Sequence, residues 1–351
     1  MPKSHVIFDG HNDALMGYAP AGPATLESFF QHNTDRQIDY PRAQEGNFGG
    51  GLFAIFATDE NILDHINDVS SGEEMTPAAI GFEFAQQVTM SMIANLFRLE
   101  EISNGRFKVV RTANELENCL KNGVMAAVCH IEGAEPIDED LYALDVFYQA
   151  GLRSLGIVWS RPTIFGYGVP FQFPHSPDTG PGITDAGKRL VQRCNQLGIM
   201  IDLSHLNEKG FWDVAKLTDA PLVATHSNAH ALCQLTRNLT DKQLDAIKES
   251  DGMVGLNFLP MFLHEDGRND LDVPLELMVQ HIDYLVERIG IDRVGFGADL
   301  GLSDIPIPQE IGDVTGYPKL MDALARAGYD DEALSKIAHK NWLRILRKTW
   351  K

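Results

Sequence analysis

Short runs of apolar residues alternate along this chain with longer stretches in which apolar residues recur at helical spacing. This alternation is typical of a parallel α/β fold, in which each strand is followed by a helix. The pattern predicts strands at 5–8, 52–57, 124–129, 153–158, 199–203, 221–224, 253–258 and 293–297. It predicts helices at about 77–99, 141–149, 185–197, 208–217, from 240 onward, 274–289 and 331–347.

Strands separated by helices are expected to pair in parallel, because each helix provides a crossover and such crossovers are right-handed. About eight of these units favour one (β/α)8 barrel of the TIM type over the alternative, an open doubly wound sheet. We see no composition break, so residues 1–351 are predicted to form a single catalytic domain. A loop at about 160–182 is rich in proline, glycine and aromatic residues. Loops of this length usually carry function.

The composition narrows the choice of partners. Lys and Arg number 29 against 49 Asp and Glu, which is a formal charge of −20, and we find no basic tract interleaved with aromatic residues. Nucleic acid and anionic membrane surfaces are therefore poor partners. The first predicted strand starts at residue 5, which leaves no room for a signal peptide, and no apolar run approaches the ~18 residues of a membrane span. We expect a cytoplasmic protein whose four scattered cysteines are free and buried.

Candidate chemistry gathers where the predicted strands end. His11 and Asp13 follow the first strand and stand two residues apart, so in an extended backbone their side chains point the same way. Other polar or aromatic residues follow later strands: Glu132, Trp159, His205, His226, Asn257 and Asp299. In a barrel all of these ends face one rim, where active sites form. Three histidines and three acids buried together would be costly without a partner, and a metal removes that cost.

Two divalent ions that share Glu132 as a bridging ligand would account for these residues most simply. His11 and Asp13 would then bind one ion, and His205 and His226 the other. A pair of cations ~3.5–4 Å apart lowers the pKa of a bridging water and polarises a carbonyl oxygen, which is the equipment of a hydrolase. Asp299 is then free to take the proton from the water and pass it to a leaving amine.

Other motifs are weaker. Gly295–Gly301 is similar to a dinucleotide-binding loop, but Pro306 and Pro308 follow where the phosphate-binding helix should start. A serine triad is disfavoured because the chain has no Gly-x-Ser-x-Gly elbow beside His205. His130 alternates onto the same strand face as Glu132 and could line the site, although a core position is favoured.

Several segments together resemble the renal (membrane) dipeptidase family of zinc peptidases, in particular its bacterial-type members. They are Asp9-Gly10-His11-Asn12-Asp13, Ile131-Glu132-Gly133, Ile201-Asp202-Leu203-Ser204-His205, Thr225-His226-Ser227, Thr236-Arg237-Asn238-Leu239 and Val294-Gly295-Phe296-Gly297-Ala298-Asp299. The resemblance runs nearly the whole length, from Asp9 to Asn341. It implies an amidohydrolase-like, metal-dependent (β/α)8 barrel with two zinc ions per chain and a metal-bridging hydroxide that attacks a dipeptide bond.

The resemblance also implies residue roles. By matching position, the metal ligands are His11, Asp13, bridging Glu132, His205 and His226. Asp299 matches the acid that handles the proton, and Arg237 matches the arginine that holds the terminal carboxylate of the dipeptide, a task that suits a planar guanidinium. Family members commonly accept a D-residue on the carboxyl-terminal side of the bond. A homodimer is consistent with the family.

One departure affects the substrate. Trp159 stands where the family usually carries a histidine that touches the scissile carbonyl oxygen, so oxyanion support falls on zinc alone, on Trp159 or on Arg161. Asn257 is a further candidate for substrate binding. The leading hypothesis is a zinc-dependent dipeptidase with small-molecule dipeptide substrates. The alternatives are a metal-dependent hydrolase of another amide, such as an N-acyl amino acid or a lactam, and a metal-binding protein without turnover.

Overall fold

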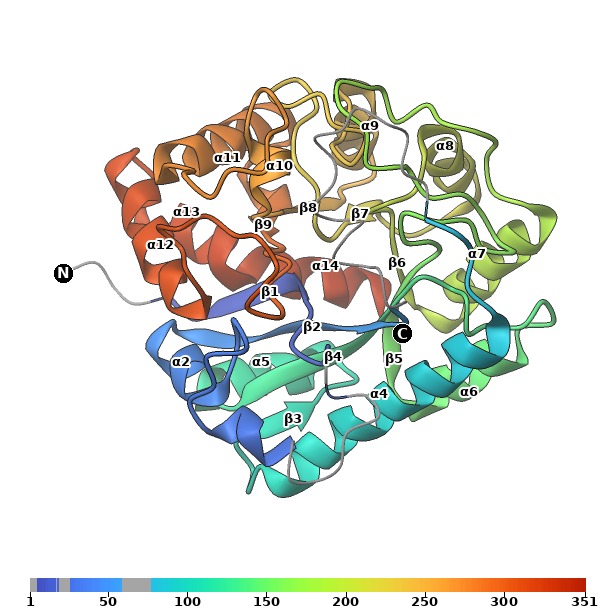
Figure 1. Cartoon of the computed structure of the whole chain (residues 1–351), viewed down its shortest axis with the longest axis horizontal. Coiled ribbons are helices and arrows are strands. Elements are labelled where there is room, and N and C mark those ends of the chain that lie inside the picture. Colours follow the sequence, from blue (N-terminus) through green and yellow to red (C-terminus); the bar gives the residue numbers. More distant parts are fainter. Residues whose placement is uncertain (1–4, 17, 19–25, 59–76) are drawn as a thin grey trace.

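Eight parallel strands pair into a barrel in the computed structural model, which describes residues 5–16, 18, 26–58 and 77–351 (Figure 1). Their order is β1-β2-β4-β5-β6-β7-β8-β9. Their bounds are β1 Ile7–Asn12, β2 Phe48–Phe56, β4 Met125–Glu132, β5 Leu152–Gly156, β6 Met200–Asp202, β7 Val223–Ala224, β8 Met253–Leu256 and β9 Val294–Phe296. A bridge between Asn12 and Leu300 brings the first strand beside the segment that follows the last. The predicted (β/α)8 barrel is confirmed.

The first strand differs from its prediction in position. The hydrophobic pattern ends at Phe8, but the polar residues Asp9 and Asn12 still pair with Gly51 and Phe53 of β2. Pairing uses backbone groups, so it continues where the side chains turn polar. The register shifts between Asp9 and Asn12, and this irregularity lies in the segment that carries His11.

An additional short strand and its helix escaped prediction. β3 (Phe107–Val109) pairs in parallel with Met125–Ala127, the first residues of β4. β5 pairs with the same edge of β4 only from Cys129 onward. α5 (Ala113–Asn122) follows, with a capping box at its start and Gly123 (φ 68°) at its end. A three-residue strand is too short to show a period in the sequence.

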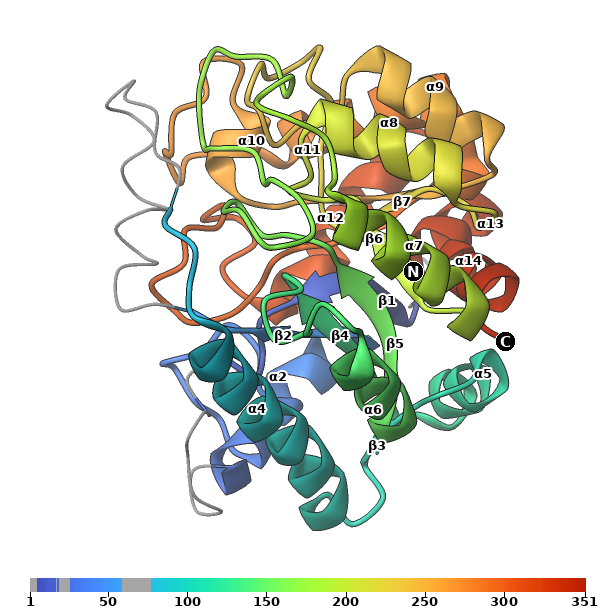
Figure 2. The same ribbon diagram turned by 90° about the vertical axis from the view of Figure 1, so that its right-hand side faces the viewer.

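Helices surround the barrel on its outside (Figure 2). Their bounds are α2 Tyr40–Glu45, α4 Phe82–Ile102, α6 Tyr142–Ala150, α7 Asp185–Leu197, α8 Glu208–Leu217, α9 Asp241–Glu249, α10 Pro260–Leu263, α11 Leu275–Ile289, α12 Tyr317–Arg326, α13 Asp331–Ser335 and α14 Asn341–Thr349. The predicted helices are present, whereas α2, α10 and α12, like α5, were not predicted. A π-helical segment, Lys336–Lys340, separates α13 from α14 inside the predicted 331–347 helix. Within the described residues, no helix is both long and apolar enough to cross a bilayer.

The last helix closes the amino-terminal end of the barrel. Trp342 of α14 belongs to the same buried cluster as Phe8, Met200 and other residues of the strands. It fits because Gly10 and Gly295 lie against it, where an added Cβ would come within 2.2 and 2.8 Å of the indole. The opposite end, at the carboxyl ends of the strands, is therefore the open rim.

The predicted long loop is present between β5 and α7 and folds back over this rim. The Val169 N–H donates to the His205 carbonyl (2.8 Å), and Gly168 lies against the Trp159 carbonyl, where a Cβ would have no room. The loop thereby carries Phe171 to the site. The four cysteines, Cys119, Cys129, Cys194 and Cys233, are free and buried as predicted.

Candidate metal centre

The structure brings the predicted ligands together at the rim. The ligand atoms of His11, Asp13 and Glu132 lie within 4.8 Å of one another, and so do those of Glu132, His205 and His226. Glu132 is thus common to both groups. The two groups are the ones that the sequence assigned to the two ions.

Glu132 presents its two oxygens to different groups. Its Oε2 lies 3.4 Å from His11 Nε2, whereas its Oε1 lies 3.1 Å from His205 Nε2 and 3.5 Å from His226 Nε2. The Nε2 atoms of His205 and His226 are 3.0 Å apart. Ring nitrogens that converge on one carboxylate oxygen in this way are arranged as ligands of a common ion.

The outer nitrogens of two histidines are held by hydroxyl groups. Ser160 Oγ lies 2.8 Å from His205 Nδ1, and Thr225 Oγ1 lies 2.8 Å from His226 Nδ1. The Thr225 hydroxyl donates to Asp202 Oδ2 (2.5 Å), so it accepts from His226 Nδ1. Such outer contacts fix the ring orientation and leave Nε2 to face the centre. Sequence reasoning missed these roles, although Ser160 and Thr225 each adjoin a predicted site residue.

Strained backbone marks two of the site residues. His205 and Asp299 have φ of 67° and 65°, in the left-handed region that residues other than glycine rarely adopt. Such strain costs about 1–3 kcal/mol per residue and collects at functional sites. Asp9 supports the same region, because its carboxylate accepts from the backbone N–H groups of His11 (2.9 Å) and Ala298 (3.0 Å).

The pKa values of the cluster reveal an excess of negative charge. Burial lowers the pKa of His205 to about 3 and holds that of His226 well below its usual range, so both rings are neutral. Burial also opposes a charge on His11, but Glu132 and, to a smaller extent, Asp299 raise its pKa to about 10. Burial and the Asp299 carboxylate raise the pKa of Asp13 well above its usual range. A cation in the centre would relieve this repulsion.

The donor set fits a metal on a second ground. Within the described residues, His11 Nδ1, His11 Nε2 and Asp13 Oδ1 are buried and have no hydrogen-bond partner. Buried polar atoms without partners are costly and rare in proteins. Histidine nitrogens mixed with carboxylate oxygens suit a divalent ion of the zinc type.

A narrow cavity of ≈ 30 Å³ opens onto the cluster, with Asp13, Glu132, His205 and Asp299 in its wall. The remaining wall is apolar and consists of Met16, Phe56, Trp159, Phe171, Leu259, Phe262 and Ile305. The predicted site residue Trp159 therefore lines the same cavity as Asp13, Glu132, His205 and Asp299, and the walls around this cluster are mostly apolar.

Arg237 is a buried cation whose contacts are neutral. Its Nη2 donates to the His226 carbonyl (3.0 Å) and its Nη1 to Ser227 Oγ (3.2 Å), while Nε has no partner in the described part of the chain. No carboxylate among the described residues lies within ion-pair distance of it. Burial lowers the pKa of its guanidinium to about 10, so it stays charged at neutral pH.

Two other predicted substrate contacts are engaged elsewhere. Asn257 Nδ2 donates to Asp299 Oδ2 (2.9 Å), which orients the predicted proton carrier. Arg161 is 0% exposed and donates from Nε to Glu135 Oε1 (2.5 Å) and from Nη2 to the Ala57 carbonyl (2.7 Å). Its place near the substrate stays a prediction.

His130 lies behind the ligands. Its Nδ1 is 2.9 Å from Ser154 Oγ, and its ring centre is 5.1 Å from that of His11. Burial lowers its pKa to about 4, so it packs as a neutral ring. The core position favoured for it agrees with this burial.

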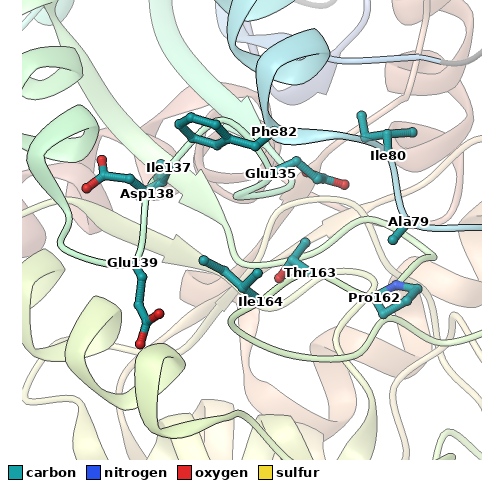
Figure 3. A pocket seen from close by; sticks show the side chains of 10 residues that line it. All are labelled: Ala79, Ile80, Phe82, Glu135, Ile137, Asp138, Glu139, Pro162, Thr163 and Ile164. Carbon is teal, nitrogen blue, oxygen red and sulfur yellow. The ribbon is translucent and has the colours of Figure 1, made fainter.

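A second and larger cavity, ≈ 480 Å³, lies outside the ligand cluster (Figure 3). Its wall is made by Ala79, Ile80, Phe82, Glu135, Ile137, Asp138, Glu139, Pro162, Thr163 and Ile164. None of the predicted metal ligands lines it. Glu135, which binds Arg161, stands on one of its walls.

Comparisons with known proteins agree with this architecture. The profile of the membrane dipeptidase family (peptidase family M19) matches residues 1–351. A solved dipeptidase, a metallopeptidase of the same family, is 49% identical with a TM-score of 0.94, covering 99% of each chain. A solved metallopeptidase from Rhodobacter sphaeroides, liganded with a phosphinate mimic of the dipeptide L-Ala-D-Ala, is 48% identical with a TM-score of 0.94, covering 99% of this chain and 100% of the other.

A curated relative from Klebsiella pneumoniae, an uncharacterized protein in the pqqA 5' region, is 48% identical over 263 residues, which are 75% of this chain and 96% of that protein. The family profile extends over all of the present chain, and both solved relatives share its fold and nearly half of its residues. This chain therefore belongs to the membrane dipeptidase family, peptidase family M19, and is a metallodipeptidase.

Proposed function

We propose that the rim binds two zinc ions and that the enzyme hydrolyses dipeptides, including those with a carboxyl-terminal D-residue. His11, Asp13 and Glu132 would hold one ion, and Glu132, His205 and His226 the other. The observation that carries this proposal is the placement of Glu132, whose Oε2 faces His11 and whose Oε1 faces His205 and His226. Two ions there would activate a water and polarise the scissile carbonyl.

Asp299 is proposed as the proton carrier. It lines the cavity, and its Oδ1 lies 3.6 Å from His11 Nε2. The amide of Asn257 donates to its other oxygen, which leaves one oxygen free to accept a proton. From this position it would take the proton of the attacking water and donate it to the amine that leaves.

Arg237 is proposed to hold the substrate carboxylate. It is a buried guanidinium without an anionic partner among the described residues. Its Nε has no hydrogen-bond partner there and is available as a donor. A carboxylate would supply the missing charge and accept a charge-assisted hydrogen bond. The mimic of L-Ala-D-Ala bound by the Rhodobacter sphaeroides relative supports a dipeptide with a D-residue as one substrate.

The test combines metal analysis with a substrate panel. Purified protein is analysed for its metals, stripped with a chelator, and assayed on L-Xaa-D-Xaa and L-Xaa-L-Xaa dipeptides before and after zinc is restored. We expect activity to vanish on stripping and to return with about two zinc ions per chain. If protein with its full metal content cleaves no dipeptide of the panel, the proposal fails.

A second candidate keeps the metals and changes the substrate to another amide. Trp159 favours it, because an indole borders the cavity where the family usually carries a histidine. N-acyl amino acids and lactams are therefore assayed beside the dipeptides. A higher kcat/KM on one of those amides, retained in Arg237→Ala, would favour this candidate.

A further inference from the structure

A buried ion pair stands behind the aromatic wall of the cavity, and the proposed reaction gives it no role. Glu135 and Arg161 have side chains that are 3% and 0% exposed, and Glu135 Oε1 lies 2.5 Å from Arg161 Nε. Arg161 Nη1 and Glu135 Oε2 have no hydrogen-bond partner in the described part of the chain. Apolar replacement of such pairs is often neutral or stabilising. Stability alone therefore does not explain this pair.

The pair joins three segments of the rim. Glu135 follows β4, Arg161 follows β5, and the Ala57 carbonyl that accepts from Arg161 Nη2 (2.7 Å) follows β2. The Glu135 carboxylate packs against Gly133, where a Cβ would lie 2.2 Å from Oε2. Gly133 has φ of 85° and directly follows the proposed bridging ligand. The pair thus connects the ligand strand to its two neighbours.

The guanidinium also supports the aromatic wall. Its carbon lies 5.2 Å from the ring centre of Phe56 and 5.5 Å from that of Trp159. These rings are 5.2 Å apart, and the Trp159 ring is 5.7 Å from that of His205. Cations near aromatic faces attract them, more strongly when both are desolvated. Arg161 therefore holds the indole toward the metal ligands from behind.

Glu135 borders the ≈ 480 Å³ cavity, and in Figure 3 it stands above Thr163 across this space. Gly133 contacts one oxygen of its carboxylate, and the other oxygen is fixed by the bond from Arg161 Nε. Loss of that contact frees Arg161 and, with it, the indole.

We propose that Glu135 and Arg161 are positioning residues that lock Trp159 and Phe56 as the wall for the amino-terminal residue of the substrate. This inference rests on the proposed function, because it takes the carboxylate of the dipeptide to lie at Arg237. Phe56 is the last residue of β2 and Trp159 follows β5, whereas Arg237 follows β7, which is farther along the strand order of the barrel. The amino-terminal residue then lies against the aromatic wall of the narrow cavity (≈ 30 Å³), which favours small side chains.

The test uses Glu135→Gln, which keeps an oxygen for Arg161 but removes the charge, and Arg161→Lys, which keeps the charge but loses the planar fork. Each is assayed on dipeptides that differ only in the amino-terminal residue, from Gly to Phe. We expect the preference for small residues, as a ratio of kcat/KM values, to fall by about tenfold. Asp245→Asn, in an exposed ion pair with Arg288, is the matched control and should keep the ratio.

A double variant that includes Trp159 distinguishes a positioning role of the pair from a general effect on the structure. In a Trp159→Ala background, Glu135→Gln should change the ratio no further. An equal loss of kcat/KM on every dipeptide, or an effect that persists without Trp159, would overturn the proposal.

A readout without catalysis keeps the inference separate from the proposed function. Acrylamide quenching of Trp159 fluorescence, taken as the difference from Trp159→Phe, should increase in Glu135→Gln and Arg161→Lys but stay unchanged in Asp245→Asn. An unchanged quenching constant in the folded variants contradicts the positioning role. Failure of the wild type to cleave dipeptides instead contradicts the proposed function and leaves the quenching result to decide whether Trp159 is held by the pair.

Discussion

Two buried arginines on different sides of the rim have opposite surroundings. Arg161 contacts the carboxylate of Glu135 and the Ala57 carbonyl, whereas Arg237 donates to the His226 carbonyl and a serine hydroxyl and has no carboxylate of the described residues within ion-pair distance. A buried charge is costly unless it is paired. The paired arginine has its counter-ion within the protein, whereas the other arginine has a place for an anion from outside. We thus expect one arginine to position the aromatic wall and the other to bind the substrate carboxylate.

The largest expected effect is on stability. Removing one partner of a buried ion pair costs about 3–5 kcal/mol, so Arg161→Met should lower the free energy of unfolding by that order. Arg237→Met removes a buried cation that forms no direct ion pair among the described residues and that the carboxylates of Asp299, Glu132 and Asp202 favour only from a greater distance, so its cost should be smaller. Urea unfolding of both variants at one metal content measures the difference, and equal losses would contradict the comparison.

Activity should show the reverse order. Arg237→Met is expected to raise KM and to lower kcat/KM by about 30-fold or more, because a desolvated charge pair with the substrate carboxylate contributes about 2–5 kcal/mol. The matched substrate is the dipeptide amide, which lacks that carboxylate and should lose little. If both substrates lose activity to the same extent, Arg237 does not bind the carboxylate.

The pH dependence of stability tests the Glu135–Arg161 ion pair. Burial raises the pKa of Glu135 above its value in the unfolded chain, while Arg161 opposes that rise. When the pKa of a carboxyl group is higher in the folded than in the unfolded protein, the folded state becomes less stable as pH rises from the unfolded to the folded pKa. The reason is that the unfolded state releases its proton first. Arg161→Met removes the opposing charge, so its deficit should be smaller at acidic than at neutral pH.

Unfolding curves of wild type and Arg161→Met across this pH range measure the change in the deficit. The control is the Glu135→Gln, Arg161→Met double variant compared with Glu135→Gln, since neither protein has a carboxylate at position 135 and the deficit between them should be flat. A deficit that grows toward acidic pH would show that Glu135 is not the group responsible.

The smallest expected effect concerns the aromatic support of Arg237. Its guanidinium carbon lies 5.2 Å from the ring centre of Phe262, a contact of about 0.5–1 kcal/mol. Phe262→Leu should therefore raise KM by a few-fold. Phe84→Leu changes an exposed ring on α4 and should leave KM as it is. An unaltered KM in Phe262→Leu would show that the ring only lines the cavity.

Much of the candidate site could be predicted because of one property of parallel barrels. Each strand ends at the same rim, so His11, Glu132, His205 and His226 were expected to meet once the strands were recognised. The short β3 was missed because a three-residue strand leaves little periodic signal. α12 was missed although its buried residues Leu320, Met321, Ala323 and Leu324 recur at helical spacing. The hydroxyl groups behind the histidines were missed because a single serine or threonine has many structural roles.

The sequence by itself determined the barrel, the order of its ligands along the chain and the charged side chains available at the rim. Periodicity and strand ends are local properties, and a sequence displays them directly. Only the tertiary structure decided which arginine is paired. Glu135 and Arg161 are 26 residues apart, and their contact arises because β4 and β5 lie side by side. Whether a buried charge is balanced depends on its neighbours in space, and this is why two arginines that look alike in the sequence have different roles.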